Sequence, residues 1–358
     1  METDNISIRL VPEKKGLILK HSVYEIISRK YTTNVCRRYN DFVTLQNLLI
    51  SKFPYRILPR LPPKQLMMDS LLEERRRGLQ RYLQIICQHP IVGISPIIEV
   101  FLTDKSTNHQ DHLQTVAAKE PDEYSTLSEN AELPLEDQGR LAASREKMRI
   151  LLNSVIKLTK LFDHSFVRLK NQSSDFKEMI GIVKSFEKHQ ETFPTETSES
   201  LVEGMNSISL SSEKSSLIQN MITEKLNLLL DVLTAHSDLC ERVEGGIVSD
   251  HQKAISKMLN INKQKIKGVI RGSAAENVHA LHKQEMEQTG VVGSLGRHSA
   301  FSLQCVLDET SLVDKYLQVL PSILLSFSYE QQKLTKDQSD IWGNVITKEC
   351  SKFIENNN

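Results

Sequence analysis

The C-terminal 220 residues of this chain carry a helical periodicity of unusual length. From residue 139 onward, apolar residues recur at gaps of three or four, apart from occasional skipped turns. Three such series run from Met148 to Val183, from Ile218 to Val269 and from Leu303 to Phe327. Each predicts a helix of about 50–70 residues, several times the usual length in globular proteins. We therefore expect residues 139–358 to form three long antiparallel helices, an all-α arrangement whose thin core favours a second chain in the same bundle.

Two features of the third series predict departures from a straight helix. Pro321 has no backbone N–H, so it removes an intrahelical hydrogen bond and predicts a bend. Gly290, Gly293 and Gly296 lie in the segment TGVVGSLGR, and each glycine weakens a helix by about 1 kcal/mol. We expect a local break in the helix at these glycines.

Residues 1–104 show a different pattern, which is that of a mixed α+β domain. Alternating apolar and β-branched residues over 5–36, with two short polar breaks, predict a three-stranded antiparallel sheet. Helical spacing follows in three segments, at 42–49, 71–87 and 97–102. Between the first two segments, four prolines over 54–63 predict an extended loop, because proline fits neither a helix interior nor a central strand.

Charge is distributed unevenly along a chain whose formal net charge is zero. Residues 1–104 hold sixteen Lys and Arg against ten Asp and Glu, and this surplus of +6 points to a localised anionic partner. The balanced total gives no whole-chain bias toward nucleic acid. Residues 105–138 have the composition of an acidic linker, and 112–118 within it have the pattern of a short amphipathic helix.

Cysteine usage and hydropathy indicate a cytosolic protein with peripheral membrane contact. The five cysteines are far apart and form no CxxC pair, which favours thiols in a reducing compartment. No apolar run approaches the roughly 20 residues that cross a bilayer. The N-terminal sequence METDNISIRL also lacks the apolar core of a signal peptide.

A first basic motif, RRYNDF, starts at Arg37, where the last predicted strand gives way to a helix. Two arginines beside a tyrosine would supply donors to a phosphate and an aromatic wall for a ring. Taken alone, the hexapeptide fits a basic pair on an edge strand, next to a core Tyr and Phe, at least as well.

A second motif, LPPKQLMM, places Lys64 directly after the proline loop. It is followed by three apolar residues, Leu66, Met67 and Met68. A lysine held above an apolar tip suits a lipid phosphate at a membrane surface. A loop whose Leu and Met cap the core is the alternative interpretation.

A third motif, EERRRGLQRY, opens the next helix with Arg75, Arg76 and Arg77. Consecutive residues on a helix point about 100° apart, so at most one or two of these arginines can face a common pocket. We expect the others to be solvated.

The order of these parts resembles the PX (phox homology) domain across essentially all of the N-terminal domain. It comprises three strands, RRYNDF, a helix, a proline loop ending in PPK, and a helix opening with EERRRGL. The resemblance implies a pocket for phosphatidylinositol 3-phosphate, in which Arg38 binds the 3-phosphate and Tyr39 stacks beneath the inositol ring. It further implies that Lys64 meets the 1-phosphate and that Arg75 hydrogen-bonds the 4- and 5-hydroxyls. Residues 66–68 match the family's membrane-inserting loop.

A PX domain followed by three long helices resembles the PX–BAR sorting nexins. The resemblance to the PX–BAR sorting nexins extends to four further segments: VPEKKGLILKH, FPYRILPRLPPK, EKLNLLLDVL and DLCER. A basic group lies near the expected tip, between the second and third helices: Lys253, Lys257, Lys263, Lys265, Lys267 and Arg271. On a BAR membrane face each charge would contribute on the order of 1 kcal/mol next to an anionic leaflet. An ordinary solvated helix face is the alternative.

The resemblance also implies a role. It implies a peripheral protein on the cytosolic face of early endosomes that binds phosphatidylinositol 3-phosphate and senses or induces curvature as a BAR dimer. The process would be endosomal cargo sorting and retrograde transport. Expected partners are a second copy of the chain or another sorting nexin, together with sorting cargo or coat proteins. The alternative is a phosphoinositide-addressed coiled-coil scaffold that recruits protein partners without remodelling membranes.

Catalysis finds no support in the sequence. GxSxG, P-loop and GxGxxG motifs are absent. His279 and His282 have the helical spacing of metal ligands, but no Asp, Glu or Cys joins them at a clear site spacing. We expect surface histidines, no metal, no cofactor and no enzymatic activity.

Overall fold

The computed structural model describes residues 6–11, 22–64, 69–125, 135–189, 195–270 and 275–355. It separates into two compact units. The first unit contains Met1–Leu151 and Asp231–Asp314, and the second contains Leu152–Leu230 and Lys315–Asn358. None of the helices within the described ranges has an apolar stretch long enough to cross a membrane.

The first unit contains the predicted three-stranded sheet. Its strands are β1 (Ile6–Leu10), β2 (Val23–Ser28) and β3 (Thr33–Arg38), and they pair antiparallel in the order β1-β2-β3. Period-two alternation sends Ile8, Ile26 and Val35 into the core, where each is at most 3% exposed. The α+β character expected of the N-terminal domain is therefore confirmed.

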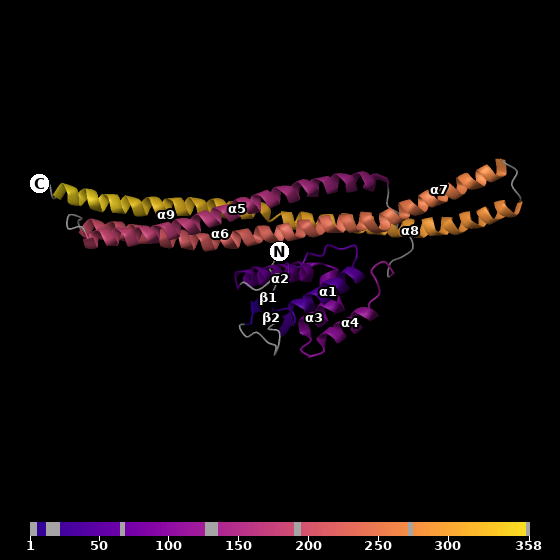
Figure 1. Cartoon of the computed structure of the whole chain (residues 1–358), viewed down its shortest axis with the longest axis horizontal. Coiled ribbons are helices and arrows are strands. Elements are labelled where there is room, and N and C mark those ends of the chain that lie inside the picture. Colours follow the sequence, from indigo (N-terminus) through magenta and orange to yellow (C-terminus); the bar gives the residue numbers. More distant parts are fainter. Residues whose placement is uncertain are drawn as a thin grey trace. The chain divides into compact units, whose positions relative to one another are not determined.

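Five short helical elements complete this domain (Figure 1). They are α1 (Tyr39–Lys52), α2 (Asp69–Gln88), a 3-10 turn (Val92–Ile94), α3 (Pro96–Thr103) and α4 (His109–Lys119). Aromatic rings of Tyr24, Phe42, Tyr82 and Phe101 meet edge to face at the centre of the core. Helix α4 covers the segment with the amphipathic pattern and buries Leu113 and Ala117 in the same core. No helix or strand interrupts residues 53–64, as the prolines predict.

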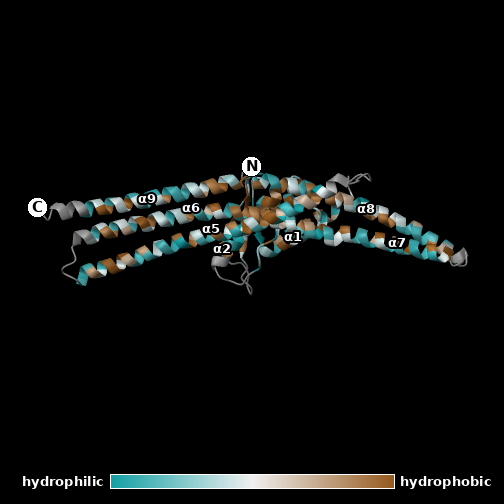
Figure 2. Cartoon of the chain, turned by 90° about the horizontal axis from the view of Figure 1, so that it is seen from above, coloured by the Kyte–Doolittle hydropathy of each residue, from teal (hydrophilic) through white to brown (hydrophobic). Residues whose placement is uncertain are grey.

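The long helices follow the three predicted series. The first series forms α5 (Leu135–His189), the second forms α6 (Thr195–Val243) and α7 (Ser249–Ile270), and the third forms α8 (Ala275–Leu317) and α9 (Leu320–Glu355). Hydrophobic and hydrophilic residues alternate along these helices in Figure 2, as expected where one face packs on a neighbour. The predicted all-α arrangement of long helices is confirmed.

Within the first unit, α7 and α8 run side by side (Figures 1 and 2). Gln288 Nε2 donates to the Ala254 carbonyl at 3.0 Å and joins the two helices. Within the second unit, α5, α6 and α9 pack together. The rings of Phe162 and Phe327 stack at 4.2 Å, and the hydroxyls of Ser173 and Ser209 lie 2.9 Å apart.

The breaks in the long helices differ in part from the sequence expectation. Helix α8 runs without interruption through Gly290, Gly293 and Gly296, so the expected local break is wrong. Packing of α8 on α7 offsets the intrinsic cost of these glycines, and a Cβ at Gly296 would already lie 3.3 Å from His251 Nε2. The interruption at Pro321 is confirmed, because α8 ends at Leu317 and Pro321 lies in the first turn of α9, where a missing N–H costs no helical bond.

A further kink between α6 and α7 was not predicted. Residues Glu244–Val248 form a π-helical turn in which Gly246 has the non-helical angles φ −95° and ψ −111°. The adjacent pair Gly245–Gly246 is the sequence signal that marks it.

His236 on α6 predicts a pH dependence of stability. Its Nε2 lies 2.8 Å from Thr310 Oγ1 on α8, and burial lowers the pKa of His236 to about 4. The folded protein therefore favours the neutral ring, whereas the unfolded chain protonates near pH 6.5. The stability that comes from burying the neutral His236 ring is complete above about pH 6.5 and is lost as the pH falls toward 4. We expect the group to remove about 2 kcal/mol of the free energy of unfolding by pH 5.

Urea unfolding at a series of pH values measures this effect. His236→Gln does not titrate, so the difference in free energy between the wild type and this variant should change with pH over that range. A difference that stays constant from pH 7.5 to pH 5 would contradict the assignment.

Candidate functional site

The two arginines of RRYNDF point to opposite sides of β3. Arg37 is 2% exposed; its guanidinium donates twice to the Phe101 carbonyl, at 3.1 and 2.8 Å, and once to the Asp104 carbonyl at 2.7 Å. Burial lowers the pKa of Arg37. Arg38 is exposed, and its backbone N–H donates to Asp41 Oδ2 at 2.6 Å, whereas its side chain has no hydrogen bond to any residue that the structure describes. The strand period thus makes Arg37 part of the core and leaves the Arg38 side chain available to a ligand.

Tyr39 and Arg75 lie together, as the resemblance implies. The guanidinium carbon of Arg75 lies 5.5 Å from the centre of the Tyr39 ring, within the range of a cation–π contact. The Tyr39 hydroxyl donates to the Pro62 carbonyl at 2.6 Å, which fixes the ring against the proline loop. Burial raises the pKa of Tyr39, so the phenol remains a neutral donor.

Lys64 stands at the end of the proline loop and close to the same tyrosine. Its Nζ lies 3.4 Å from Oδ1 of Asn40, the residue after Tyr39. The loop is held by Gly78 of α2, because a Cβ there would lie 3.0 Å from Pro62 Cβ. Leu66, Met67 and Met68, expected to enter the membrane, lie outside the described residues.

The three arginines of EERRRGL have different surroundings. Arg75 lines a cavity of about 390 Å³ between the proline loop and α2. Arg76 donates to the Ile8 carbonyl of β1 at 2.8 Å and pairs with Glu73 at 2.7 Å. Arg77 lies 3.8 Å from the same Glu73 carboxylate. Of the three, Arg75 is therefore the one placed for a ligand beside Tyr39.

Arg38 and Asp41 line a second groove, of about 670 Å³. Lys105 and His109 line the same groove, and His109 Nε2 lies 3.3 Å from Asp41 Oδ2. Arg75 and Lys64 therefore both lie close to the Tyr39–Asn40 segment. Arg38 is the last residue of β3 and immediately precedes Tyr39 in the sequence.

Comparison with known proteins decides the family. Residues 25–105 match the PX domain family. Sorting nexin-8 of Homo sapiens is 32% identical over 365 residues, which cover 96% of this chain and 78% of that protein. Sorting nexin-8 of Bos taurus is 32% identical over 371 residues, which cover 98% of this chain and 81% of that protein. The chain is a PX–BAR sorting nexin.

A solved structure shows the same fold for this sorting nexin. The SNX-BAR Mvp1 tetramer matches with a TM-score of 0.74 at 18% identity, over 95% of this chain and 99% of that one. The resemblance to the PX–BAR sorting nexins found in the sequence is confirmed. Sorting nexins are not enzymes, so the expectation of a non-enzymatic protein is also confirmed.

The basic residues near the tip of this sorting nexin are only partly unpaired. Lys265 pairs with Glu285 of α8, and Lys253 lies 3.0 Å from Asp250. Three further lysines of α7 are exposed and form no ion pair with any residue that the structure describes: Lys257, Lys263 and Lys267. Arg271 lies outside the described residues.

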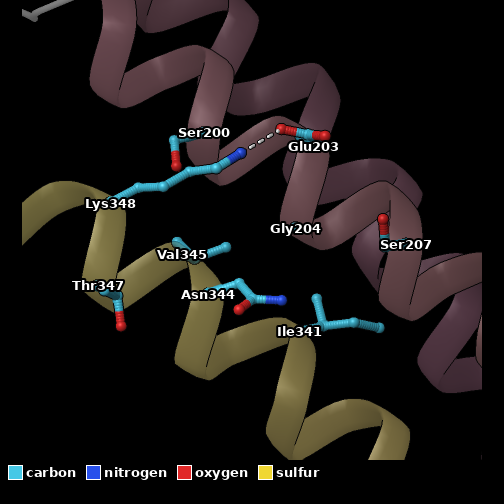
Figure 3. Close-up of a pocket in the computed structure, with 9 residues that line it drawn as sticks. All are labelled: Ser200, Glu203, Gly204, Ser207, Ile341, Asn344, Val345, Thr347 and Lys348. Carbon is cyan, nitrogen blue, oxygen red and sulfur yellow. Dashed lines mark hydrogen bonds and ion pairs between the residues drawn. The ribbon is translucent and has the colours of Figure 1, made fainter.

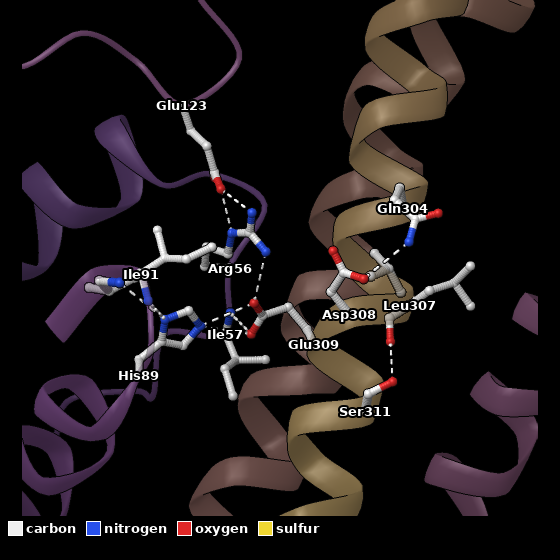
Figure 4. A network of polar contacts seen from close by, with 12 residues as sticks. Arg56, Ile57, His89, Ile91, Glu123, Gln304, Leu307, Asp308, Glu309 and Ser311 are labelled. Atoms are coloured by element: carbon white, nitrogen blue, oxygen red, sulfur yellow. Dashed lines mark hydrogen bonds and ion pairs between the residues drawn. The ribbon is translucent and has the colours of Figure 1, made fainter. Parts of the chain in front are cut away.

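A buried charge network escaped the sequence analysis (Figure 4). Glu309 of α8 is 2% exposed and accepts from His89 Nε2 at 3.0 Å, from Arg56 Nη1 at 3.2 Å and from the Ile57 N–H at 3.2 Å. Arg56 also pairs with buried Glu123. The network ties the start of the proline loop to a long helix of the sorting nexin.

Hydrogen bonding fixes the tautomer of His89 in this network. Its Nδ1 accepts from the backbone N–H groups of Ile91 and Val92, at 3.2 and 3.1 Å, so the ring proton lies on Nε2 and points to Glu309. For the Glu309 carboxyl, burial raises the pKa, but the His89 and Ile57 hydrogen bonds and the Arg56 charge outweigh burial and leave the pKa below its usual value.

Two other features, a groove in the second unit and the histidine pair of α8, do not form a catalytic site from the residues that the structure describes. A groove of about 540 Å³ in the second unit lies between α6 and α9, where Lys348 pairs with Glu203 at 3.1 Å (Figure 3). Both partners are more than half exposed, so their interaction is weak. His279 is exposed, and His282 lies 3.3 Å from Glu285 Oε2. No group of three His, Cys, Asp or Glu suited to a metal occurs within the described ranges.

Proposed function

We propose that this sorting nexin is a peripheral endosomal membrane protein that binds phosphatidylinositol 3-phosphate. In the proposed site, Arg38 takes the 3-phosphate, Tyr39 carries the inositol ring, Lys64 meets the 1-phosphate and Arg75 meets the 4- and 5-hydroxyls. The observation that supports it most is the Arg75 guanidinium held 5.5 Å from the Tyr39 ring centre, with that ring fixed on Pro62. A preformed platform of this kind reduces the ordering cost of binding.

We propose further that two copies associate through the second unit and act together on curved membrane during cargo sorting and retrograde transport. An apolar groove of about 490 Å³ lies between α6 and α9. Met221 and Leu325 line it and are 68% and 70% exposed, which is unusual for large apolar side chains in a protein that works alone. The related Mvp1 protein was solved as a tetramer. Two linked pockets would raise the apparent affinity for membrane without any new contact.

Exposed lysines of α7 support an additional membrane contact in this proposal. Lys257, Lys263 and Lys267, with Lys253, Lys265 and Arg271, would form the basic face toward anionic lipid. Pairing of Lys265 with Glu285 reduces its share. The apolar residues Leu66, Met67 and Met68 would enter the bilayer beside the headgroup.

Arg38→Ala tests the lipid site. Loss of a charged hydrogen-bonding partner should weaken binding to liposomes containing phosphatidylinositol 3-phosphate by about tenfold or more. Co-sedimentation with and without the lipid measures the effect, and Arg29→Ala removes the same charge from an exposed turn of the same domain as a control. Undiminished binding by Arg38→Ala would refute the pocket assignment.

A further inference from the structure

The cavity beside Arg75 is unusual in its charge. Three arginines line it, namely Arg60, Arg75 and Arg81, beside two carboxylates, Glu74 and Asp231, and the arginines would suit several phosphates. The cavity extends from the proline loop past Gly78 of α2. Arg75, which in the proposed site meets the 4- and 5-hydroxyls, lines this cavity, so the cavity adjoins those positions of the inositol ring.

Carboxylates of the long helix α6 already form ion pairs with two of the three arginines. Arg81 Nε donates to Asp231 Oδ2 at 2.6 Å, and Asp231 itself lines the cavity. Arg60 makes a two-pronged pair with Asp238, at 2.7 and 2.6 Å, and the hydrogen bond to Asp238 raises the pKa of Arg60. Arg81 and Asp231 are only 18% and 31% exposed, so solvent screens this pair incompletely.

We infer that Asp231 and Asp238 act as a charge filter that keeps the lipid site selective for a singly phosphorylated inositol headgroup. This inference rests on the proposed function. A phosphate added at the 4- or 5-position would enter a space where Arg60 and Arg81 are already paired and where the Asp231 carboxylate repels it. A free hydroxyl at the same position carries no charge and meets no such repulsion.

The test compares lipids that differ by one phosphate. Full-length wild type and the double variant Asp231→Asn/Asp238→Asn are sedimented with liposomes that hold phosphatidylinositol 3-phosphate or 3,5-bisphosphate. We expect the double variant to gain about fivefold or more in apparent affinity for the bisphosphate and to change less than about twofold on the monophosphate. Asparagine keeps the shape of aspartate, and the single variant Asp231→Asn should show part of the gain.

A matched control separates the filter from a general effect of charge. Asp250→Asn removes one acidic charge from exposed α7, where Asp250 pairs with Lys253, and should leave the preference between the two lipids unchanged. A double variant with the wild-type preference, or with equal gains on both lipids, would overturn the filter while leaving the lipid site intact. A wild type that ignores the monophosphate would overturn the proposed function and the filter with it.

Discussion

Replacing Glu309 by alanine is expected to lower the free energy of unfolding by about 3–5 kcal/mol, the usual cost of removing one partner from a buried ion pair. The carboxylate accepts from Arg56, His89 and the Ile57 N–H, and all three donors would remain buried without this acceptor. The residue is 2% exposed, so water cannot replace the lost oxygen atoms without opening the packing. Urea or thermal unfolding of the full chain, followed by circular dichroism, measures the effect.

The neighbouring residue provides the control for this experiment. Asp308 lies beside Glu309 on α8 but is exposed, and it accepts from Gln304 of its own helix at 3.0 Å (Figure 4). Asp308→Ala should change the free energy of unfolding by no more than about 0.5 kcal/mol. Equal free energies of unfolding for the two alanine variants would show that the buried network does not stabilise the fold.

Charged substitutions in the groove of the second unit should separate the proposed pair of chains. Met221→Glu combined with Leu325→Glu would place two carboxylates in the apolar groove between α6 and α9, where a partner would have to desolvate them. We expect self-association to weaken at least about 100-fold, because centrally buried contacts dominate interface energies. Light scattering across a range of concentrations gives the molecular mass.

Ile270→Glu is the control for the groove variant. Ile270 is 79% exposed and lies on α7, outside the groove, so this change should leave the mass unchanged. A double variant with the mass of the wild-type assembly would place the interface elsewhere on the chain, whereas a wild type that is monomeric at every concentration would refute self-association.

Much of the fold follows from local patterns that the sequence displays openly. Alternation over Ile6–Leu10 and β2 predicts strands, and spacings of three and four predict the long helices, because each pattern must bury one face. The candidate lipid site was also accessible from sequence, since Arg38, Tyr39, Lys64 and Arg75 lie in short motifs whose order is characteristic. The burial of Arg37 and the exposure of Arg38 follow from the period of two along β3.

Other features depend on contacts between distant residues and could not be predicted. Glu309 meets Arg56 across 253 positions of sequence, and nothing local marks either residue as buried. The break expected at Gly290–Gly296 is wrong for a related reason: local propensity is about 1 kcal/mol per glycine, and packing of α8 against α7 exceeds it. The kink at Gly246 had a local signal in its glycine pair, but the strong helical periodicity on either side concealed it.

The buried network also imposes an order on events during synthesis of the chain. Arg56, His89 and Glu123 all leave the ribosome long before Glu309, which lies 220 positions after His89. The N-terminal domain can therefore fold and let Arg56 pair with Glu123 while His89 and the Ile57 N–H still lack their acceptor. Arrival of α8 supplies that acceptor, so the last third of the chain completes a contact prepared by the first.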